Sequence, residues 1–186
     1  MDNTVIITGG AGFIGSAVIR HLLQTRDCDV VNVDSLTYAG NIETTNSFRN
    51  NPKYHFEHRN ICDKQALPEI FNRYQPRAIM HLAAESHVDR SIDGPLEFIE
   101  TNIVGTYNLL EVCRQYLGYL TGDDTGSKFR FHHISTDEVF GTLGDDGLFT
   151  VQLPRGGAHG LFQHCLDRIL DAVKRWQVRR QLALVV

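Results

Sequence analysis

The chain has 186 residues, of which 42% are hydrophobic and 22% are charged, and its formal net charge is −4. A chain of this size buries a substantial core, and without an overall positive charge we expect it to bind neither nucleic acid nor an anionic membrane. No apolar run approaches the ~18 residues that span a bilayer and no cationic signal sequence opens the chain, so we expect a cytoplasmic protein. The four cysteines are far apart in the sequence: Cys28, Cys62, Cys113 and Cys165. This spacing suggests neither a metal site nor disulfides, so we expect buried thiols.

Apolar runs and helical patterns alternate along the chain. In order, the predicted elements are a strand at 5–7, a helix at 13–23, strands at 30–33 and 54–56, a helix at 64–73, a strand at 78–82, a helix at 95–119, a strand at 129–135, a helix at 161–177 and a strand at 182–186. Strands separated by helices imply βαβ units and a parallel sheet. We therefore expect an α/β fold, a doubly wound, Rossmann-like parallel sheet of about six strands, as one domain spanning 1–186.

A glycine-rich turn, T-G-G-A-G-F-I-G, follows the first predicted strand and opens the first predicted helix. The missing side chains at Gly9, Gly12 and Gly15 allow a tight turn, close approach of a pyrophosphate, and packing of helix on strand. Phe13 and Ile14 begin the helix, whose unpaired N–H groups and positive dipole end favour phosphates. The pattern predicts a dinucleotide site. The alternative is a turn that packs without a ligand.

Further candidate cofactor residues follow the next three predicted strands. Asp34 ends the second strand, where a carboxylate accepts hydrogen bonds from the adenosine ribose and repels a 2′-phosphate, which favours NAD over NADP. Asn60 and Ile61 follow the third strand, where an adenine would lie, although Asn60 is equally explained as a turn residue. The fourth strand is followed by Leu82, Ala83 and Ala84, whose side chains suit a strand end that passes close to a cofactor. Helix packing alone would also favour the two alanines.

Five segments together resemble one enzyme family. They are T-G-G-A-G-F-I-G (8–15), D-S-L-T-Y-A-G-N (34–41), H-L-A-A-E-S-H-V-D-R-S-I (81–92), E-T-N-I-V-G-T-Y-N-L-L-E (100–111) and H-I-S-T-D-E-V-F-G (133–141). In combination they strongly resemble the dTDP-glucose 4,6-dehydratases, which are extended short-chain dehydrogenase/reductases. The resemblance covers roughly residues 1–150 and implies NAD as the cofactor.

The resemblance also implies an internal redox cycle on a nucleotide-bound glucose. NAD⁺ takes a hydride from C4, water leaves across C5 and C6, and the hydride returns to C6. In the family pattern Asp137 protonates the departing C6 hydroxyl, Glu138 takes the C5 proton, and Thr136 hydrogen-bonds the C4 oxygen. Two adjacent carboxyl groups in different environments supply the acid and the base. Without the resemblance, the same triplet is explained as a polar turn.

Two departures from the family pattern weaken the expectation of catalysis. The family removes the C4 hydroxyl proton with a Tyr that has a Lys four residues later, and none of the six tyrosines here has Lys at that spacing. Counting back from the last predicted strand places Phe162 and Leu166 at these positions, and counting forward from the family-like stretch places Leu161 and Cys165 there. The family pattern also includes a C-terminal substrate domain, which we expect this chain to lack. We therefore expect impaired or no catalysis and at most weak binding of a dTDP-sugar.

Residues 151–186 diverge from the family, either through an altered reading frame or as a segment that still folds as a helix and a strand. The helically spaced apolar stripe at 161–177 favours the second explanation. Together with Leu109, Leu110 and Val112 it leaves more apolar surface than one sheet face requires, so we expect a homodimer or a soluble aggregate. Three functions compete: a working dehydratase, an NAD-binding module that pairs with a full-length homologue, and a truncated or altered gene product without a selected activity.

Overall fold

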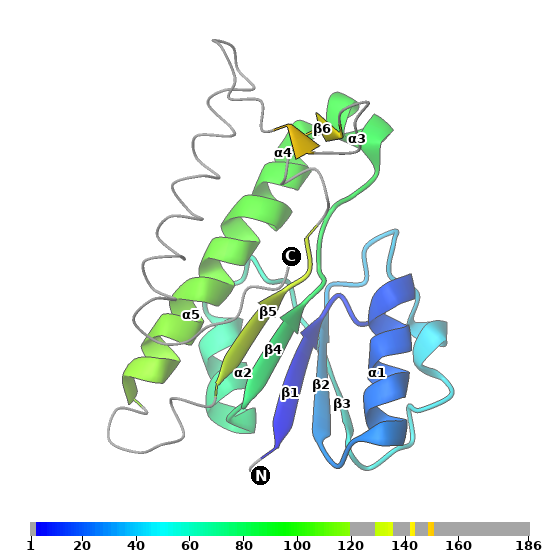
Figure 1. Cartoon of the computed structure of the whole chain (residues 1–186), viewed down its shortest axis with the longest axis vertical. Helices are drawn as coiled ribbons and strands as arrows, with labels where there is room; N and C mark the ends of the chain where they lie inside the picture. Colours follow the sequence, from blue (N-terminus) through cyan, green and yellow to red (C-terminus); the bar gives the residue numbers. More distant parts are fainter. Residues whose placement is uncertain (1–2, 120–128, 136–141, 144–148, 151–186) are drawn as a thin grey trace. The chain divides into compact units, whose positions relative to one another are not determined.

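The computed structural model describes residues 3–119, 129–135, 142–143 and 149–150. Contacts within the chain divide it into two units, Met1–His133 and Ile134–Val186. Figure 1 shows the sheet and the described helices, all of which belong to the first unit. In the second unit, β6 (Thr142–Leu143) and β7 (Phe149–Thr150) form a short antiparallel pair that the sequence patterns did not predict. One domain over 1–186 stays a prediction, because most of the second unit lies outside the described residues.

Five parallel strands form the sheet of the first unit. They are β1 (Thr4–Thr8), β2 (Asp29–Asp34), β3 (Tyr54–His58), β4 (Ala78–His81) and β5 (Arg130–His133). Their order is β3-β2-β1-β4-β5, and every neighbouring pair is parallel. The predicted doubly wound, Rossmann-like α/β fold is confirmed. The sixth predicted strand, at 182–186, lies outside the described residues.

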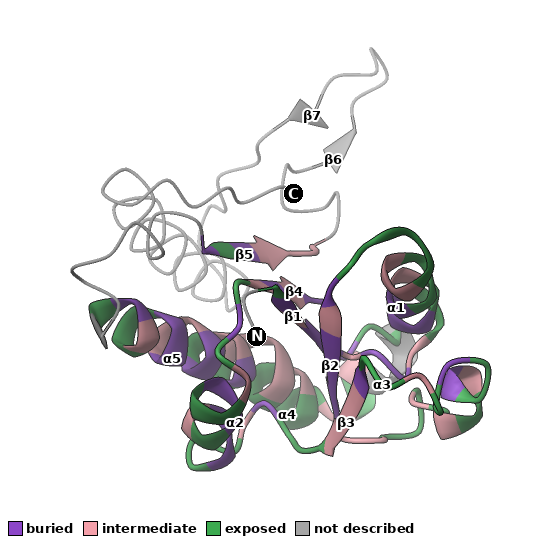
Figure 2. Ribbon diagram, turned by 90° about the horizontal axis from the view of Figure 1, so that it is seen from below, coloured by how far each residue is buried: buried purple, intermediate pink, exposed green. Residues whose placement is uncertain are grey.

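The connections between the strands place helices on both faces of the sheet. α1 (Phe13–Thr25) connects β1 to β2, and the 3₁₀ helix η1 (Ile42–Thr45) follows between β2 and β3, in one direction along the sheet. α2 (Ala66–Tyr74) and α5 (Thr106–Tyr119) lead the other way, to β4 and β5. Such crossovers are right-handed, so opposite directions put the helices on opposite faces. Figure 2 shows this arrangement, with α2 and α5 together on one side and α1 on the other.

The helix predicted at 95–119 is interrupted. Its path consists of α4 (Pro95–Phe98), a π-helical segment η2 (Ile99–Gly105) and α5. A further short helix, α3 (Val88–Asp93), precedes it. A π turn accommodates one more residue than an α turn, and apolar spacing does not distinguish such a local insertion from a continuous helix.

Apolar packing fills both faces of the sheet. On the α1 side the buried cluster consists of Ile7, Ile19, Cys28, Val30, Phe48 and Tyr54. Alternation along β1 directs Ile6 to the opposite face, where Phe71 of α2 and Tyr116 of α5 pack edge to face with ring centroids 5.4 Å apart. Cys28 and Cys113 are buried free thiols, as predicted, whereas Cys62 is only partly buried. Cys165 lies outside the described residues.

The apolar positions that we expected to leave surplus surface on the long helix are largely occupied by the chain's own packing. Leu109 is 0% exposed and Val112 is 7% exposed, because this face of α5 packs against the sheet and α2. The prediction that Leu109 and Val112 leave apolar surface free for dimerisation is therefore wrong. Exposed apolar side chains lie instead nearer the start of the helical path: Ile92, Leu96, Ile99, Val104 and Tyr107.

The direction of the strand connections reverses between β1 and β4. The chain moves outward from β1 to β2 and β3, then returns across the sheet to β4 on the other side of β1. In open parallel sheets, ligands bind beyond the carboxyl ends of the strands at such a reversal. The fold therefore predicts a ligand site between the segments that follow β1 and β4.

Candidate functional site

A groove of about 640 Å³, including space open to solvent at its mouth, lies beyond the carboxyl ends of the strands. Segments that follow β1, β2, β3 and β4 form its wall, with one residue from the π-helical segment. Eight of the predicted cofactor residues come together here: Gly9, Gly12, Asp34, Asn60, Ile61, Leu82, Ala83 and Ala84. Residues from several separate parts of the sequence thus form one concave surface.

The turn after β1 depends on the absence of side chains. Gly9 has φ +72°, in the left-handed region, and an added Cβ would lie 2.7 Å from the backbone nitrogen of Ala83. The N–H of Gly9 continues the pairing with β2 by donating to the carbonyl of Val33 at 2.9 Å. At Gly15 an added Cβ would lie 2.2 Å from the carbonyl oxygen of Gly9. The glycines thus allow the turn to contact β4 on one side and α1 on another.

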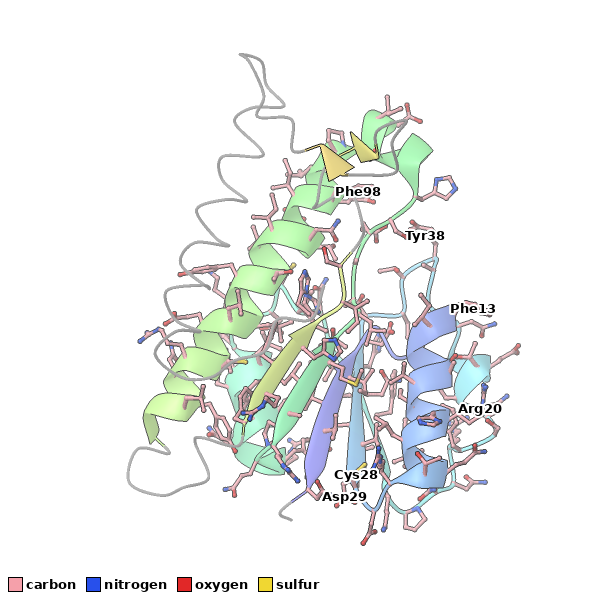
Figure 3. All side chains as sticks on the ribbon, in the orientation of Figure 1. Phe13, Arg20, Cys28, Asp29, Tyr38 and Phe98 are labelled. Carbon is pink, nitrogen blue, oxygen red and sulfur yellow. The ribbon has the colours of Figure 1, made fainter. Side chains whose placement is uncertain are left out.

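The N-terminus of α1 opens beside this turn. Gly12 is the N-cap residue, and no side chain within the described part of the chain caps the helix. The first N–H groups of an α-helix have no partner inside the helix, so those of Phe13 and Ile14 are available to a ligand. The side chains of these residues do not belong to the groove wall: they are 92% and 61% exposed, and Figure 3 shows Phe13 at the end of the helix. Gly15 is buried beneath the turn.

Asp34 ends β2 as predicted, and its carboxylate is held by the backbone. One oxygen accepts the N–H of Ala11 and the other accepts the N–H of Leu36, each at 2.8 Å. The residue is only 8% exposed. Asp34 therefore fixes the glycine turn and the segment after β2 against each other, in addition to contributing to the groove wall.

Asn60 and Ile61 follow β3 and are attached to the π-helical segment and α5. The Asn60 side-chain oxygen accepts the N–H of Cys62 at 2.8 Å, so Asn60 is a turn residue as well as part of the groove wall. Asn108 donates to the carbonyls of Ile61 and Cys62, both at 3.3 Å. An added Cβ at Gly105 would lie 2.6 Å from the Ile61 side chain, which would have to shift to accommodate it.

A chain of buried polar groups fixes the segment that follows β4. The hydroxyl of Thr8 accepts the N–H groups of Leu82 and Ala83 at 3.2 Å each, so its own proton is donated to Nδ1 of His81, 2.7 Å away. The neutral imidazole therefore carries its proton on Nε2 and donates it to the hydroxyl of Thr106 at 2.9 Å. Burial lowers the pKa of His81 to about 3, and the neighbouring His133 contributes to this shift.

Glu85 and the residues around it close the groove on the β4 side. Its buried carboxylate accepts the hydroxyl proton of Tyr38 at 2.9 Å, which links the segments after β2 and β4. Figure 3 shows Tyr38 directed toward the latter segment. Asn102, in the π-helical segment, exchanges two 2.8 Å hydrogen bonds with the backbone of Glu85. Its neighbour Thr101 thereby reaches the groove wall.

Sequence reasoning missed several residues of this surface. Glu85 and Thr101 line the groove but depend on a π turn that apolar spacing does not predict. Arg59 also lines it and directly follows β3, so the strand-end rule that selected Asn60 applies to it too. The network of Thr8, His81 and Thr106 gives no sequence signal, because it joins the ends of three separate elements.

The predicted catalytic residues Thr136, Asp137 and Glu138 lie outside the described residues, as do the positions proposed to replace the family's Tyr and Lys: Phe162 and Leu166, or Leu161 and Cys165. In the described part of the chain, no group of three or more His, Cys, Asp or Glu side chains could hold a metal ion. No helix there has the length and apolar character needed to cross a membrane. The cytoplasmic location expected from the sequence stays a prediction.

The glycine turn at the reversal point of a doubly wound sheet has the architecture of the nucleotide-binding domains of short-chain dehydrogenase/reductases. A family model described as GDP-mannose 4,6 dehydratase matches residues 6–152. The chain belongs to this family of nucleotide-sugar 4,6-dehydratases, and the predicted resemblance to its dTDP-glucose members is confirmed.

Curated relatives and solved structures agree on this family. The dTDP-glucose 4,6-dehydratase of Salmonella typhimurium is 61% identical over 139 residues, 75% of this chain and 38% of that protein. The enzyme of Neisseria meningitidis is 58% identical over 152 residues, 81% and 42% of the two chains. The crystal structure of the Bacillus anthracis enzyme in complex with NAD has a TM-score of 0.73 and 29% identity, covering 97% of this chain and 53% of that one. That of Streptomyces venezuelae, with NAD bound, has a TM-score of 0.73 and 35% identity, covering 92% and 52%. The chain thus spans about two fifths of the length of these curated relatives.

The buried His81 predicts a pH dependence of stability. Its pKa is about 3 in the folded chain against 6.5 when exposed, so between these values the unfolded chain binds a proton that the folded chain does not. Stability should therefore fall as the pH decreases through this window, by up to ~1.4 kcal/mol per pH unit from this one group. Burial also lowers the pKa of His133, which adds to the same slope.

Urea unfolding at several pH values measures this effect. The substitution His81→Gln should reduce the slope of unfolding free energy against pH without abolishing it, because His133 remains. The matched control is His21→Gln on α1, where the ring is exposed in both states, and it should keep the wild-type slope. An unchanged slope in the His81 variant would contradict the buried, neutral state assigned to His81.

Proposed function

We propose that this chain binds NAD in the groove at the carboxyl edge of its sheet. The observation that carries the proposal is the glycine turn at the reversal point, which joins an uncapped helix N-terminus, a strand-end carboxylate and the end of β4 in one concave surface. The solved relatives that contain NAD support the same cofactor. When bound, NAD supplies a hydride acceptor.

The residues present fit such a ligand. An added Cβ at Gly12 would meet only the carbonyl oxygen of Gly9, at 3.2 Å, so the space in front of this residue is open. The N–H groups of Phe13 and Ile14 and the positive end of the α1 dipole suit the two phosphates. Asp34 and Asn60 lie at the ends of β2 and β3, where the adenosine would be held.

Asp34 gives the groove a preference between the two dinucleotides. Its carboxylate is an acceptor for ribose hydroxyls and repels a phosphate at the 2′ position. We therefore rank NAD above NADP. The segment after β4 lines the groove where the remainder of the cofactor would lie, with Leu82, Ala83 and Ala84.

The substitution Gly12→Ala separates binding from folding. Gly12 has φ −77°, which alanine adopts without strain, and because Gly12 lines the groove we expect the added methyl group to reduce the space for a ligand. NAD affinity should fall about tenfold or more, whereas the unfolding free energy should change by no more than ~1 kcal/mol, the order of an N-cap effect. Calorimetric titration with NAD and urea unfolding measure the two quantities.

The matched control is Gly118→Ala in α5, where an added Cβ meets no atom within 4 Å. This variant should bind NAD as the wild type does. Wild-type affinity in the Gly12 variant, or no NAD binding by the folded wild-type chain, would refute the proposed site.

The sequence lacks the Tyr and Lys pair with which the family reaction begins. The family reaction begins by removing a proton from the C4 hydroxyl, and the Tyr and Lys that would do this are missing from the 186 residues. Elimination across C5 and C6 depends on the ketone formed at C4. Without that ketone, Asp137 and Glu138 would have no activated substrate, and Thr136 would have no C4 ketone to hydrogen-bond. We infer a chain that binds NAD, holds a dTDP-sugar weakly at most, and is catalytically impaired.

An assay for the 4-keto-6-deoxy product tests this inference. The wild-type chain with saturating NAD⁺ and dTDP-glucose should form no product above a control without protein, because loss of a general base alone costs ~10²–10⁴-fold in rate. A full-length relative from the same family provides the positive control. Product formation by this chain would show that another group acts as the base.

We also propose that two copies of the chain pair through the stretch that contains α3, α4, η2 and the start of α5. Five large apolar side chains are exposed there, from 37% at Val104 to 75% at Ile92, with Leu96, Ile99 and Tyr107 between these values. Exposed apolar surface of this kind is typical of protein interfaces.

Sedimentation at micromolar concentration tests the pairing. The wild-type chain should sediment as a dimer, and Leu96→Arg should shift it toward the monomer, because the exposed leucine would be replaced by a charge in the interface. The control Gln24→Arg adds the same charge to an exposed polar position of α1 and should leave the dimer intact. A wild-type monomer would rule the proposal out.

A further inference from the structure

A buried side-chain amide in the middle of β2 is only half satisfied by hydrogen bonds. Asn32 is 0% exposed, and its Nδ2 donates to the hydroxyl of Tyr54 at 3.0 Å. Its Oδ1 is buried and accepts no hydrogen bond from the described part of the chain. A buried acceptor without a partner destabilises a fold, and an apolar side chain would avoid that loss. Stability alone therefore does not explain an amide at this position.

Gly10 of the glycine turn lies directly against this amide. β1 and β2 pair Ile7 with Asn32, so the Asn32 side chain is on the α1 face of the sheet. An added Cβ at Gly10 would lie 2.2 Å from Oδ1 of Asn32 and 2.5 Å from Cδ1 of Ile19. Because position 10 carries no side chain, the turn can approach the carboxamide this closely.

The start of α1 also contacts Gly10. An added Cβ at Gly15 would lie 2.8 Å from Cα of Gly10, and Ile19 packs beside it one helical turn further on. Gly10 thus lies in contact with β2 and with the first turns of the helix, and the size of the Asn32 side chain limits how closely the turn approaches the strand. The N-cap residue, Gly12, is only two residues along, so the helix N-terminus follows any displacement of the turn.

Tyr54 holds the carboxamide in place. Its ring belongs to the buried cluster that contains Ile19, and it packs edge to face against Phe48 with ring centroids 5.0 Å apart. Burial raises the pKa of Tyr54, so the phenol stays neutral and its oxygen accepts the Nδ2–H of Asn32. The carboxamide is therefore fixed by a side chain that packing itself immobilises, and it cannot rotate away from Gly10 without losing this bond.

We propose that Asn32 is a positioning residue for the cofactor: its carboxamide, held by Tyr54, supports Gly10 and so fixes the N-terminus of α1 where the pyrophosphate binds. The inference rests on the proposed binding of NAD in this groove. Asn32 is fully buried and is not part of the groove wall, so it acts only through the turn. Hydrogen bonds to phosphate depend on direction, so a displaced turn would misdirect the N–H groups of Phe13 and Ile14.

Titration of the full 186-residue chain with NAD⁺, ADP and adenosine tests this role. In Asn32→Ala the Kd for NAD⁺ and for ADP should rise about tenfold, because the unsupported turn no longer directs the helix N–H groups at the phosphates. The Kd for adenosine, which has no phosphate, should change by less than about twofold. A merely structural role would not separate ligands with a pyrophosphate from one without it. Calorimetry measures the first two affinities and an NMR titration the third.

Refilling the space beneath the turn should restore binding. When Gly10→Ala is added to Asn32→Ala, the new methyl group occupies the space of the carboxamide, and the terminal methyl of Ile19 can shift. The Kd for NAD⁺ should return to within about threefold of the wild-type value. Gly10→Ala alone should weaken NAD⁺ binding, because its methyl group meets Oδ1 of Asn32.

Tyr54→Phe gives a milder test that does not require the core to tolerate Asn32→Ala. It removes only the hydroxyl that holds the carboxamide and should raise the Kd for NAD⁺ about threefold. The matched control is Tyr74→Phe in α2, which removes a hydroxyl that donates to Glu57 at 2.8 Å outside the groove. This control should keep the wild-type affinity for NAD⁺.

The outcomes separate the inference from the proposed function. An equal loss of NAD⁺ and adenosine binding in Asn32→Ala would mean that the whole groove is disturbed, and it would overturn the positioning role. Wild-type NAD⁺ affinity in Asn32→Ala would overturn it too, and if that variant does not fold, wild-type affinity in Tyr54→Phe does so. In each of these cases NAD binding by the wild-type chain stands. If the wild-type chain binds none of the three ligands, the proposed function fails together with this inference.

Discussion

An added methyl group at Gly9 would lie 2.7 Å from the backbone nitrogen of Ala83, so the turn after β1 and the segment after β4 are in direct backbone contact. This contact occurs where the strand order reverses, and any side chain at position 9 would separate the two segments. Gly15, in the first turn of α1, has the same requirement, because an added Cβ would lie 2.2 Å from the carbonyl oxygen of Gly9. The groove exists because these two approaches bring the start of α1 and the end of β4 to the same place.

Buried polar groups then hold the two segments in register. His81 is hydrogen-bonded to Thr8 and to Thr106, and the Thr8 hydroxyl also accepts the N–H groups that follow β4. Asp34 accepts the backbone N–H groups of Ala11 and Leu36. An unsatisfied buried polar group costs ~1–3 kcal/mol, so such networks specify one arrangement. The same bonds fix the Asp34 carboxylate at the end of β2, where it lines the groove.

Local chemistry made part of the site predictable. The glycine spacing identified the turn, and the rule that residues after parallel strands share one edge identified Asp34, Asn60 and the segment at 82–84. The contribution of Thr101 could not be predicted, because it depends on a π turn stabilised by Asn102 and Glu85. His81 could not be assigned either, since its partners are 73 and 25 residues away. The burial of Leu109 followed from packing against α2, which no single-helix pattern contains.

A crystal structure of this chain grown with NAD tests the central claim most directly. We expect the pyrophosphate against the N–H groups of Phe13 and Ile14, the adenosine beside Asp34 and Asn60, and the remainder of the cofactor along Leu82 to Ala84. NAD bound at another surface, or a folded chain whose groove contains no NAD at saturating concentration, would contradict it.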